Sequence, residues 1–239
     1  MAAKKRRTTR GGRTAAEIMA ELQRDPEYQA RRAEEAAQRA ERVRQWREAA
    51  EPLIQELGEA GVCVQSPWDL VPRREPYRDA LPILLRHLER PYPSRVREGI
   101  ARALAVPDPM VRDAWPRLIR LYRAEPPGEV RQAVALILAN SARPDDLDTV
   151  LGLLRDPRLG ESRGMLVGYL EKHARAMPRA QKALMALGDD PQLHLEVQDA
   201  LKRNRRREKE RLRARERRAA KRREKEAAKR RGDRNAGED

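Results

Sequence analysis

Three histidines are the side chains of this chain that most readily bind metals or transfer protons at neutral pH. His87, His173 and His194 lie far apart in the sequence, none lies three or four residues from another, and none is followed directly by glutamate. Metal ligands on one helix need such a spacing to share a face, so the sequence excludes a zinc-protease type of site. We expect each histidine to occupy a half-buried polar position.

The single cysteine and the known nucleophile motifs give no sign of catalysis either. Cys63 lies between Val62 and Val64 without a nearby histidine or cationic cluster, which predicts an inert, buried thiol. One cysteine cannot form an intramolecular disulfide or a cysteine-based metal cluster. The sequence has no GxxxxGK phosphate loop and no GxSxG motif. It therefore predicts a protein that is not an enzyme and binds no metal or cofactor.

The positive charge, a usual sign of nucleic-acid binding, is confined to the two ends of the chain. The formal net charge is +15, to which residues 1–13 contribute +6 and residues 202–231 contribute +13 from 18 basic and 5 acidic side chains. The last eight residues contribute −2, so residues 14–201 also sum to −2. A near-neutral middle gives no electrostatic footprint for a duplex.

The C-terminal basic run is a candidate electrostatic handle for RNA or DNA. Residues 202–231 lack Gly and Pro, and their Ala, Arg and Glu content favours a helix. Leu212 is the only large apolar residue, so this helix should project into solvent without packing on a core. It has no aromatic side chains for base stacking and no amphipathic face for a membrane. Binding should therefore be non-specific and salt-sensitive; the alternative is a solubilising tail without a ligand. The candidate polyanion-contacting residues are Arg205, Arg206, Arg207, Arg211, Arg213, Arg215, Arg217, Arg218, Lys221, Arg222 and Arg223.

The outer segments carry no signal for a membrane. No apolar run approaches the roughly 20 residues that cross a bilayer, and no hydrophobic segment follows the basic N-terminus. We expect a cytoplasmic protein, with residues 1–13 as a disordered basic arm and residues 203–239 as a basic helical, then disordered, tail. Arg outnumbers Lys 44 to 9, a usage typical of GC-rich bacterial genomes.

Residues 14–76 are predicted to form an N-terminal helical extension. Thr14 and Glu17 have the spacing of a capping box, and Asp25-Pro26 is a second helix start. A long helix should then run to about Ala60, with its C-terminal half docked on the rest of the chain. Its apolar positions recur every 3.4 residues on average: Ala33, Ala36, Ala40, Val43, Trp46, Ala50, Leu53 and Leu57. Ser66-Pro67-Trp68-Asp69 predicts a short capped turn of helix that Trp68 anchors.

Residues 77–202 align with themselves as pairs of helices. Similar segments begin at Val96, Val130, Ser162 and Val197, which are 34, 32 and 35 residues apart. Leucine recurs at one position of the first three copies, Leu104, Leu138 and Leu170, whereas the fourth copy has Arg205. The preceding helices also align, which gives four units over about 77–106, 110–141, 145–174 and 177–202. Such units cannot bury their apolar faces alone, so they should stack.

These units resemble HEAT-type repeats, including the short bacterial variety. The resemblance rests on Leu-Leu-Arg-Asp-Pro at 153–157, which ends a first helix, and Val-Arg-Gln-Ala-Val at 130–134, which opens a second one. It covers about half of the chain and implies an all-α fold, a short α-solenoid. It also implies that Arg97, Arg131 and Arg163 support the turn of a neighbouring unit. The third unit departs from the pattern at Ser162, Gly160, Gly164 and Gly168, which puts its second helix in doubt or requires unusually close packing.

Two catalytic types of HEAT-like protein require residues that can be sought in this sequence. HEAT-type metal hydroxylases need repeated His-Glu ligands, which this sequence lacks. HEAT-like DNA glycosylases use an Asp and aromatic residues in a basic concave groove, for which Asp113 and Trp115 are candidates. The second-helix positions that would line the groove are not basic: Glu98, Gln132 and Gly164 form one row and Arg102, Leu136 and Gly168 the other.

The resulting prediction is a non-catalytic protein-interaction adaptor on a HEAT-like solenoid. The alternative is a nucleic-acid-associated protein that binds RNA or DNA through its basic tails. A toxin-immunity protein is a third interpretation, which rests only on the use of helical-repeat scaffolds in such systems. The sequence identifies neither the protein partner nor the oligomeric state.

Overall fold

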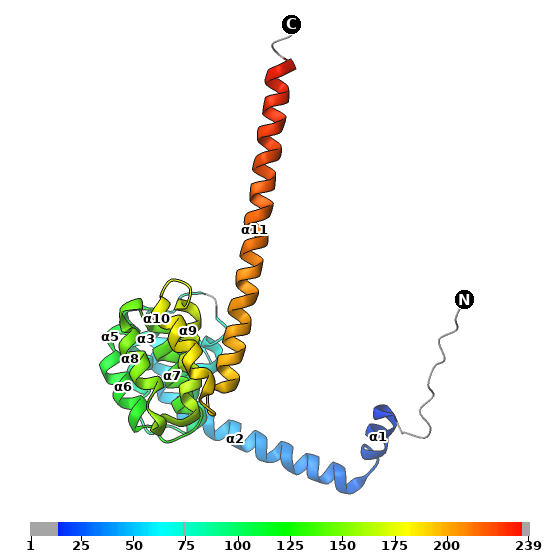
Figure 1. The fold of residues 1–239 in the computed structure, drawn as a ribbon. Coiled ribbons are helices and arrows are strands. Elements are labelled where there is room, and N and C mark those ends of the chain that lie inside the picture. Colours follow the sequence, from blue (N-terminus) through cyan, green and yellow to red (C-terminus); the bar gives the residue numbers. More distant parts are fainter. Residues whose placement is uncertain (1–13, 74, 236–239) are drawn as a thin grey trace, which may run out of the picture. The chain divides into compact units, whose positions relative to one another are not determined.

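The structure is a computed structural model that describes residues 14–73 and 75–235, with the backbone alone for Glu17 and residues 222–235. The predicted basic arm and the last four residues lie outside this range. All regular secondary structure of the described part is helical and it contains no strand, which confirms the all-α fold class (Figure 1). The chain divides between Pro52 and Leu53 into two compact units.

The first unit consists of α1 (Ala15–Leu22) and most of α2 (Pro26–Glu59). The Asp25 carboxylate accepts a hydrogen bond from the backbone N–H of Glu27 at 2.9 Å, so the predicted helix start is confirmed. Pro52 lies inside α2, where its ring nitrogen cannot donate to a carbonyl of the preceding turn. The boundary between the units therefore falls where the helix lacks a backbone hydrogen bond.

The second unit contains the end of α2 and every later helix. Its elements are η1 (Pro67–Leu70), α3 (Ala80–His87), α4 (Ser94–Ala103), α5 (Pro109–Asp113), α6 (Trp115–Ala124), α7 (Glu129–Ser141), η2 (Pro144–Asp146), α8 (Leu147–Leu154), η3 (Pro157–Arg163), α9 (Gly164–His173), α10 (Pro178–Ala186), η4 (Leu187–Asp189) and α11 (His194–Asn235).

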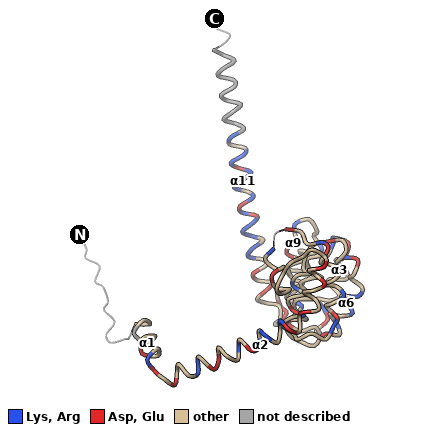
Figure 2. Tube along the Cα trace, turned by 180° about the vertical axis from the view of Figure 1, so that it is seen from behind, with Lys and Arg blue, Asp and Glu red and all other residues tan. Residues whose placement is uncertain are grey.

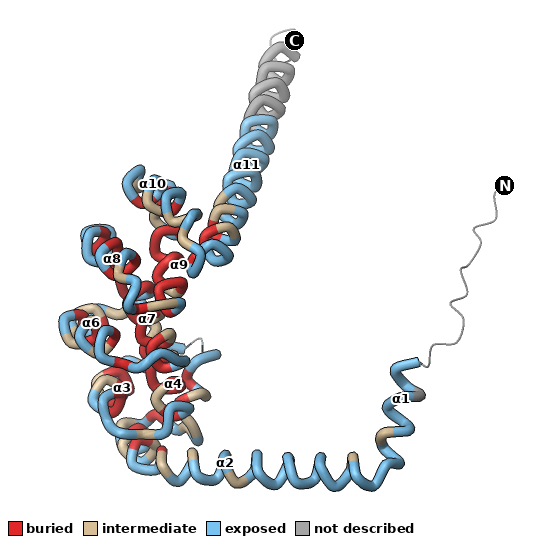
Figure 3. The backbone as a smooth tube through the Cα atoms, turned by 60° about the horizontal axis from the view of Figure 1, so that its bottom comes forward, coloured by how far each residue is buried: buried red, intermediate tan, exposed pale blue. Residues whose placement is uncertain are grey.

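These helices pack in a repeating order. Each of α3, α6, α8 and α10 contacts the long helix that follows it, and α4, α7, α9 and the start of α11 contact one another in succession. Figure 3 shows the two series on opposite sides of the unit, with the buried residues between them. The interior of the unit is therefore built mainly by the second series.

The core of this unit consists of aliphatic side chains at equivalent positions of successive helices. Six of them are inaccessible to solvent: Ile100, Leu104, Val134, Leu138, Leu166 and Leu170. Burial of such a side chain contributes about 1.5–3 kcal/mol. Arg205, the equivalent position of α11, is exposed, so the apolar face ends there.

The third predicted repeat, residues 145–174, departs from the sequence pattern for local reasons. Its second helix forms, as α9, but begins only at Gly164, after η3 and a kink at Gly160, whose φ is +59°. The buried Ser162 donates to the Leu159 carbonyl at 2.6 Å and lies 2.9 Å from the Tyr122 hydroxyl. Tyr122 aligns with a leucine in the other predicted repeats, and Ser162 supplies the partner that its buried phenol needs.

The short helix η1 fixes the chain between α2 and α3 onto α4. Ser66 and Asp69 form a capping box, which confirms the predicted turn. The Trp68 indole N–H donates to the Arg95 carbonyl at 3.0 Å, and the ring lies against Gly99. A Cβ at Gly99 would lie 2.7 Å from the indole nitrogen, so only glycine admits Trp68 here.

None of the helices within residues 14–235 combines the length and the apolar character that a crossing of the bilayer requires.

Candidate functional site

Arg97, the first recurrent arginine, joins two successive helix pairs. Its Nε donates to the Leu88 carbonyl at 3.1 Å, beyond the end of α3. Its two terminal nitrogens donate to the Glu125 carboxylate, after α6, at 2.7 and 2.6 Å. The planar guanidinium matches the carboxylate in a bidentate pair, so Arg97 joins the turn after α3 to the turn after α6.

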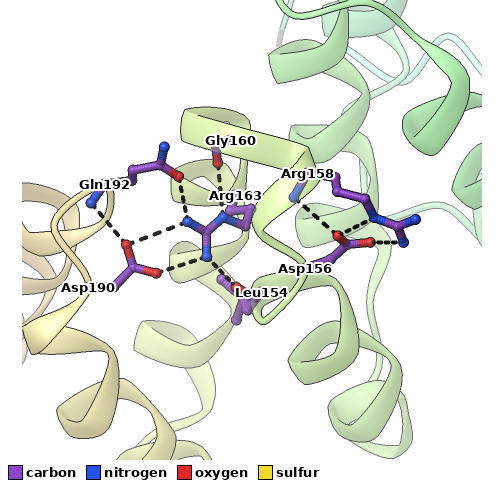
Figure 4. A network of polar contacts seen from close by, with 7 residues as sticks. All are labelled: Leu154, Asp156, Arg158, Gly160, Arg163, Asp190 and Gln192. Atoms are coloured by element: carbon purple, nitrogen blue, oxygen red, sulfur yellow. Dashed lines mark hydrogen bonds and ion pairs between the residues drawn. The ribbon is translucent and has the colours of Figure 1, made fainter.

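Arg163 occupies the equivalent position before α9 and makes the same kind of joint (Figure 4). It donates to the Leu154 carbonyl at 2.8 Å, at the end of α8, and to Asp190 at 2.9 Å in the turn before α11. It also donates to the Gln192 side-chain oxygen at 2.7 Å. Partial burial favours a neutral Asp190, but the hydrogen bonds from Arg163 and from the backbone of Gln192 prevail, so the pKa of Asp190 lies below its usual value.

Arg131 links the two joints through backbone carbonyls. Its Nε donates to the carbonyl of Glu125 at 2.5 Å, and its Nη1 donates to that of Arg158 at 3.3 Å. The Arg158 guanidinium binds Asp156, and this hydrogen bond lowers the pKa of Asp156 to about 2 (Figure 4). The three arginines thus connect the turns at intervals of 27 and 28 residues.

A second cluster surrounds Trp68. The Arg95 guanidinium stacks over the indole with its central carbon 3.7 Å from the ring centroid. The buried Glu98 accepts from Arg95 at 3.0 Å and from Arg102 at 2.8 Å. Glu98 is thus neutralised by arginines of its own helix, and the cluster holds η1 in place.

The C-terminal end of α2 is bound to α3, whose His87 also contacts the turn that follows it. His87 is fully buried, with Nε2 2.6 Å from Glu56 and Nδ1 2.8 Å from the Tyr92 hydroxyl. Arg86 pairs with the same carboxylate. The hydrogen bond from His87 is the main cause of the lowered pKa of Glu56, and Arg86 adds to it.

The three histidines do not share the half-buried environment that was expected. His87 is fully buried because it bridges two helices, and His194 is exposed, with Nδ1 2.8 Å from the Gly188 carbonyl. His173 alone is intermediate; it packs against Tyr169, its Nε2 has no hydrogen-bond partner among the described groups, and burial lowers its pKa. Within the described residues, no group of three or more His, Cys, Asp or Glu side chains can hold a metal ion.

Cys63 is exposed, so the prediction of a buried thiol was wrong. The segment after Gly61 is not helical, and consecutive side chains of such a segment point in different directions. Val62 takes the buried position and leaves Cys63 in solvent. The apolar neighbours in the sequence were therefore no guide to burial.

The two residues of the glycosylase hypothesis, Asp113 and Trp115, lie in different environments. Trp115 is 2% exposed, its indole N–H donates to Ser141 at 2.8 Å, and Arg112 covers its ring. Asp113 is exposed. Trp115 is thus a core residue and cannot stack on a base in this arrangement. Of the second-helix positions that would line a concave groove, Glu98 and Gly164 are buried and cannot contact a duplex.

Residues 203–207 of α11, here called its root, pack on α9. This differs from the expectation that the basic run makes no contact with a core. Glu171 is 8% exposed and accepts from Arg203 at 2.8 Å and from Arg207 at 2.8 Å. The Asn204 side chain donates to the Glu171 carbonyl at 3.2 Å. Arg207, a candidate polyanion contact, is therefore already paired with a carboxylate of its own chain.

Beyond this root, α11 continues as a helix to Asn235, and residues 208–221, the last whose side chains are described, are all exposed. The candidates Arg205, Arg206, Arg211, Arg213, Arg215, Arg217, Arg218 and Lys221 are all exposed. Arg206 pairs with Glu210 at 3.0 Å, and Figure 2 shows how densely basic residues follow one another along α11. The side chains of Arg222 and Arg223 lie outside the described range.

Sequence reasoning missed the acidic partners of these arginines. Glu125, Asp190 and Glu171 do not stand out in a chain with so many carboxylates. Their only signal is distance: Glu125 follows Arg97 by 28 residues and Asp190 follows Arg163 by 27, slightly less than one repeat.

No protein-family model, curated protein or solved structure matches this chain.

Proposed function

We propose that residues 77–202 form a short α-solenoid of four HEAT-like helical hairpins, which serves as a non-catalytic scaffold for protein interactions. Two features support this architecture: the successive packing of α4, α7, α9 and α11, and the spacing of the arginine joints. In a solenoid each unit contacts only its neighbours, and this is the pattern of contacts around Arg97 and Arg163.

The observation that carries the proposal is the use of the interior charges. The buried Glu98, Glu125, Arg131, Arg163 and Glu171 each have partners within the chain, mostly in an adjacent helix or turn. Groups held in this way stabilise a fixed geometry. These buried charged side chains therefore join helices to one another, as a rigid binding platform requires.

The first half of α2 is the surface on which we place a protein partner. Along the sequence of α2, the apolar positions that are buried at Leu53 and Leu57 recur toward the N-terminus, as a stripe, at Val43 and Trp46, which are partly exposed, and then at exposed alanines. A helix that lies against another through such a stripe is the usual arrangement of a coiled coil.

The charges beside this stripe favour an acidic partner helix over a second copy. Arg32, Arg39 and Arg44 occupy the positions that flank it, and all three are exposed. Arg44 also pairs with Glu41 on its own helix. In a homodimer these flanks would bring like charges together, whereas a helix with acidic flanks would pair with Arg32 and Arg39.

A capture experiment with nuclease treatment tests this function. The tagged full chain is compared with Val43→Glu/Trp46→Glu, which places charges on the stripe, and with Gln38→Glu/Gln45→Glu, which adds the same charge on the opposite face. We expect a protein partner that survives nuclease, is retained by the second variant and is lost from the first. Equal capture by both variants would count against the α2 surface, and loss of all partners on nuclease treatment would count against the adaptor.

A second candidate function is association with nucleic acid, and the exposed basic part of α11 favours it. Phosphate contacts release counterions, so binding to any RNA or DNA should fall steeply between about 50 and 200 mM salt. Anisotropy titrations of the full chain with both nucleic acids over this range test it. Affinity that does not change with salt would rule out such binding.

A further inference from the structure

Residues 205–221 of α11 carry basic side chains on opposite sides of the helix. One row has a basic residue at every fourth position: Arg205, Lys209, Arg213, Arg217 and Lys221. A second row begins at Arg207, which Glu171 already binds, and continues with the exposed Arg211 and Arg215. Since each residue advances about 100° around the axis, the two rows begin about 160° apart. Three acidic residues, against ten basic ones, interrupt this surface without forming a face of their own.

A polyanion that neutralises both rows must reach the helix from more than one side. A flat anionic surface, such as a membrane, would meet one row and leave the other in solvent. The major groove of B-form DNA is about 12 Å wide and admits an α-helix of about 10–12 Å diameter, with phosphates along both walls. The major groove of A-form RNA is too narrow and deep for side chains to read.

From this complementarity we infer that residues 205–221 lie in the major groove of B-form DNA and bind it without sequence preference. The inference rests on the second candidate function and specifies its ligand. The segment spans about 25 Å at about 1.5 Å per residue, somewhat less than one turn of the duplex. It contains no Asn or Gln to read adenine, and arginines spread around the whole helix cannot all face the base edges, so phosphate contacts dominate the affinity.

Contacts between α9 and the root of α11 orient the helix before any ligand binds. Glu171 holds Arg203 and Arg207 from α9, and the exposed segment follows directly. Because the root is fixed by three contacts from one residue, α11 leaves α9 in a defined direction. A helix that is already oriented loses less entropy on binding.

The test compares two variants with equal loss of charge. Lys209→Gln/Arg213→Gln/Arg217→Gln removes three charges from the first row, and Arg207 is left in place in both variants. Arg211→Gln/Arg215→Gln/Arg218→Gln removes three from the opposite side. Anisotropy is measured with the full chain, a 24-base-pair DNA duplex and an RNA duplex of the same sequence.

We expect both variants to bind the DNA duplex at least roughly tenfold more weakly than the unmodified chain. Each should reduce the slope of log affinity against log salt by about 2.7, since each phosphate contact contributes about 0.9. A DNA duplex with bulky groups on pyrimidine C5, which fill the major groove, should also bind at least roughly tenfold more weakly.

The outcomes separate this inference from the function on which it rests. Equal affinity for RNA and DNA, no effect of the C5 groups, or an effect of only one variant would overturn the groove inference and leave nucleic-acid binding intact. Failure to bind any nucleic acid at about 50 mM salt would overturn both. Binding to phosphatidylserine vesicles but not to DNA would show that the ligand is a membrane surface.

Discussion

At the scale of single residues, the arginine joints allow a direct test of their energetic role. Arg163 is 3% exposed, and its replacement by alanine leaves the Leu154 carbonyl without this donor and the Asp190 carboxylate without its cationic partner. Removal of one partner of a buried ion pair costs about 3–5 kcal/mol. Because Asp190 keeps some contact with solvent, we expect Arg163→Ala to lower the free energy of unfolding by about 3 kcal/mol in urea titrations.

Two further variants show whether the geometry or only the charge matters. Arg163→Lys keeps the positive charge but loses the planar fork of the guanidinium. Its free energy of unfolding should therefore lie between that of the wild type and that of the alanine variant. Arg179 pairs with Asp148 where both side chains are largely exposed, and Arg179→Ala should change stability by less than about 1 kcal/mol. A loss at Arg179 as large as that at Arg163 would contradict this role of the joint.

His173 gives the molecule a predictable response to acid. Its pKa is lowered mainly by burial and also by Lys172, so the unfolded chain takes up the proton at a higher pH than the folded chain. By linkage, the free energy of unfolding falls as the pH decreases through the ordinary histidine pKa, about 6.5. We expect His173→Phe, which cannot titrate, to reduce the loss of stability between about pH 7 and pH 5 in urea titrations.

Lys172→Gln provides the control for this prediction. It leaves the imidazole in place but removes the neighbouring positive charge that contributes to the lowered pKa. The acid-dependent loss should therefore become smaller without disappearing. If His173→Phe keeps the full pH dependence of the wild type, other groups are responsible for it.

At the scale of elements, two glycines in helices should respond to alanine with opposite signs. A Cβ at Gly99 in α4 would lie 2.7 Å from the Trp68 indole, whereas a Cβ at Gly152 in α8 would meet nothing within 4 Å. We expect Gly99→Ala to destabilise the fold by about 1–3 kcal/mol and Gly152→Ala to stabilise it by up to about 1 kcal/mol. Urea midpoints measure both, and equal effects would mean that Trp68 is free to move.

The helices could be predicted from the sequence because their signals are local. Asp25-Pro26 and Ser66-Pro67 start helices through hydrogen bonds within a few residues. The environments of Cys63 and His87 could not be predicted in this way. Whether such a side chain is buried depends on an element distant in the sequence; for His87 the decisive residue is Glu56, 31 positions away.

At the scale of the whole molecule, the sequence period predicted where buried leucines recur but not which side chains join successive helix pairs. The period is visible because the buried positions tolerate few residue types, as at Leu104 and Leu138. The acidic partners vary instead: Glu125 binds one arginine through its carboxylate, and Asp190 and Gln192 share another. Such variation conceals a joint in the sequence although its geometry is conserved in space.

The free energy of local opening should differ widely between the buried and the exposed helices of this chain. The amides of α7 lie in the middle of the buried series, since α7 contacts both α4 and α9. Residues 28–45 of α2 and 208–221 of α11 are mostly exposed, and a helix without tertiary contacts is only marginally stable in water. In native-state hydrogen exchange we expect α7 to require global unfolding, whereas the two exposed segments should open at about 0–2 kcal/mol. If residues 28–45 exchange as slowly as α7 at micromolar concentration and lose this protection on dilution, the α2 stripe is covered by a second copy, and the acidic partner proposed for it is wrong.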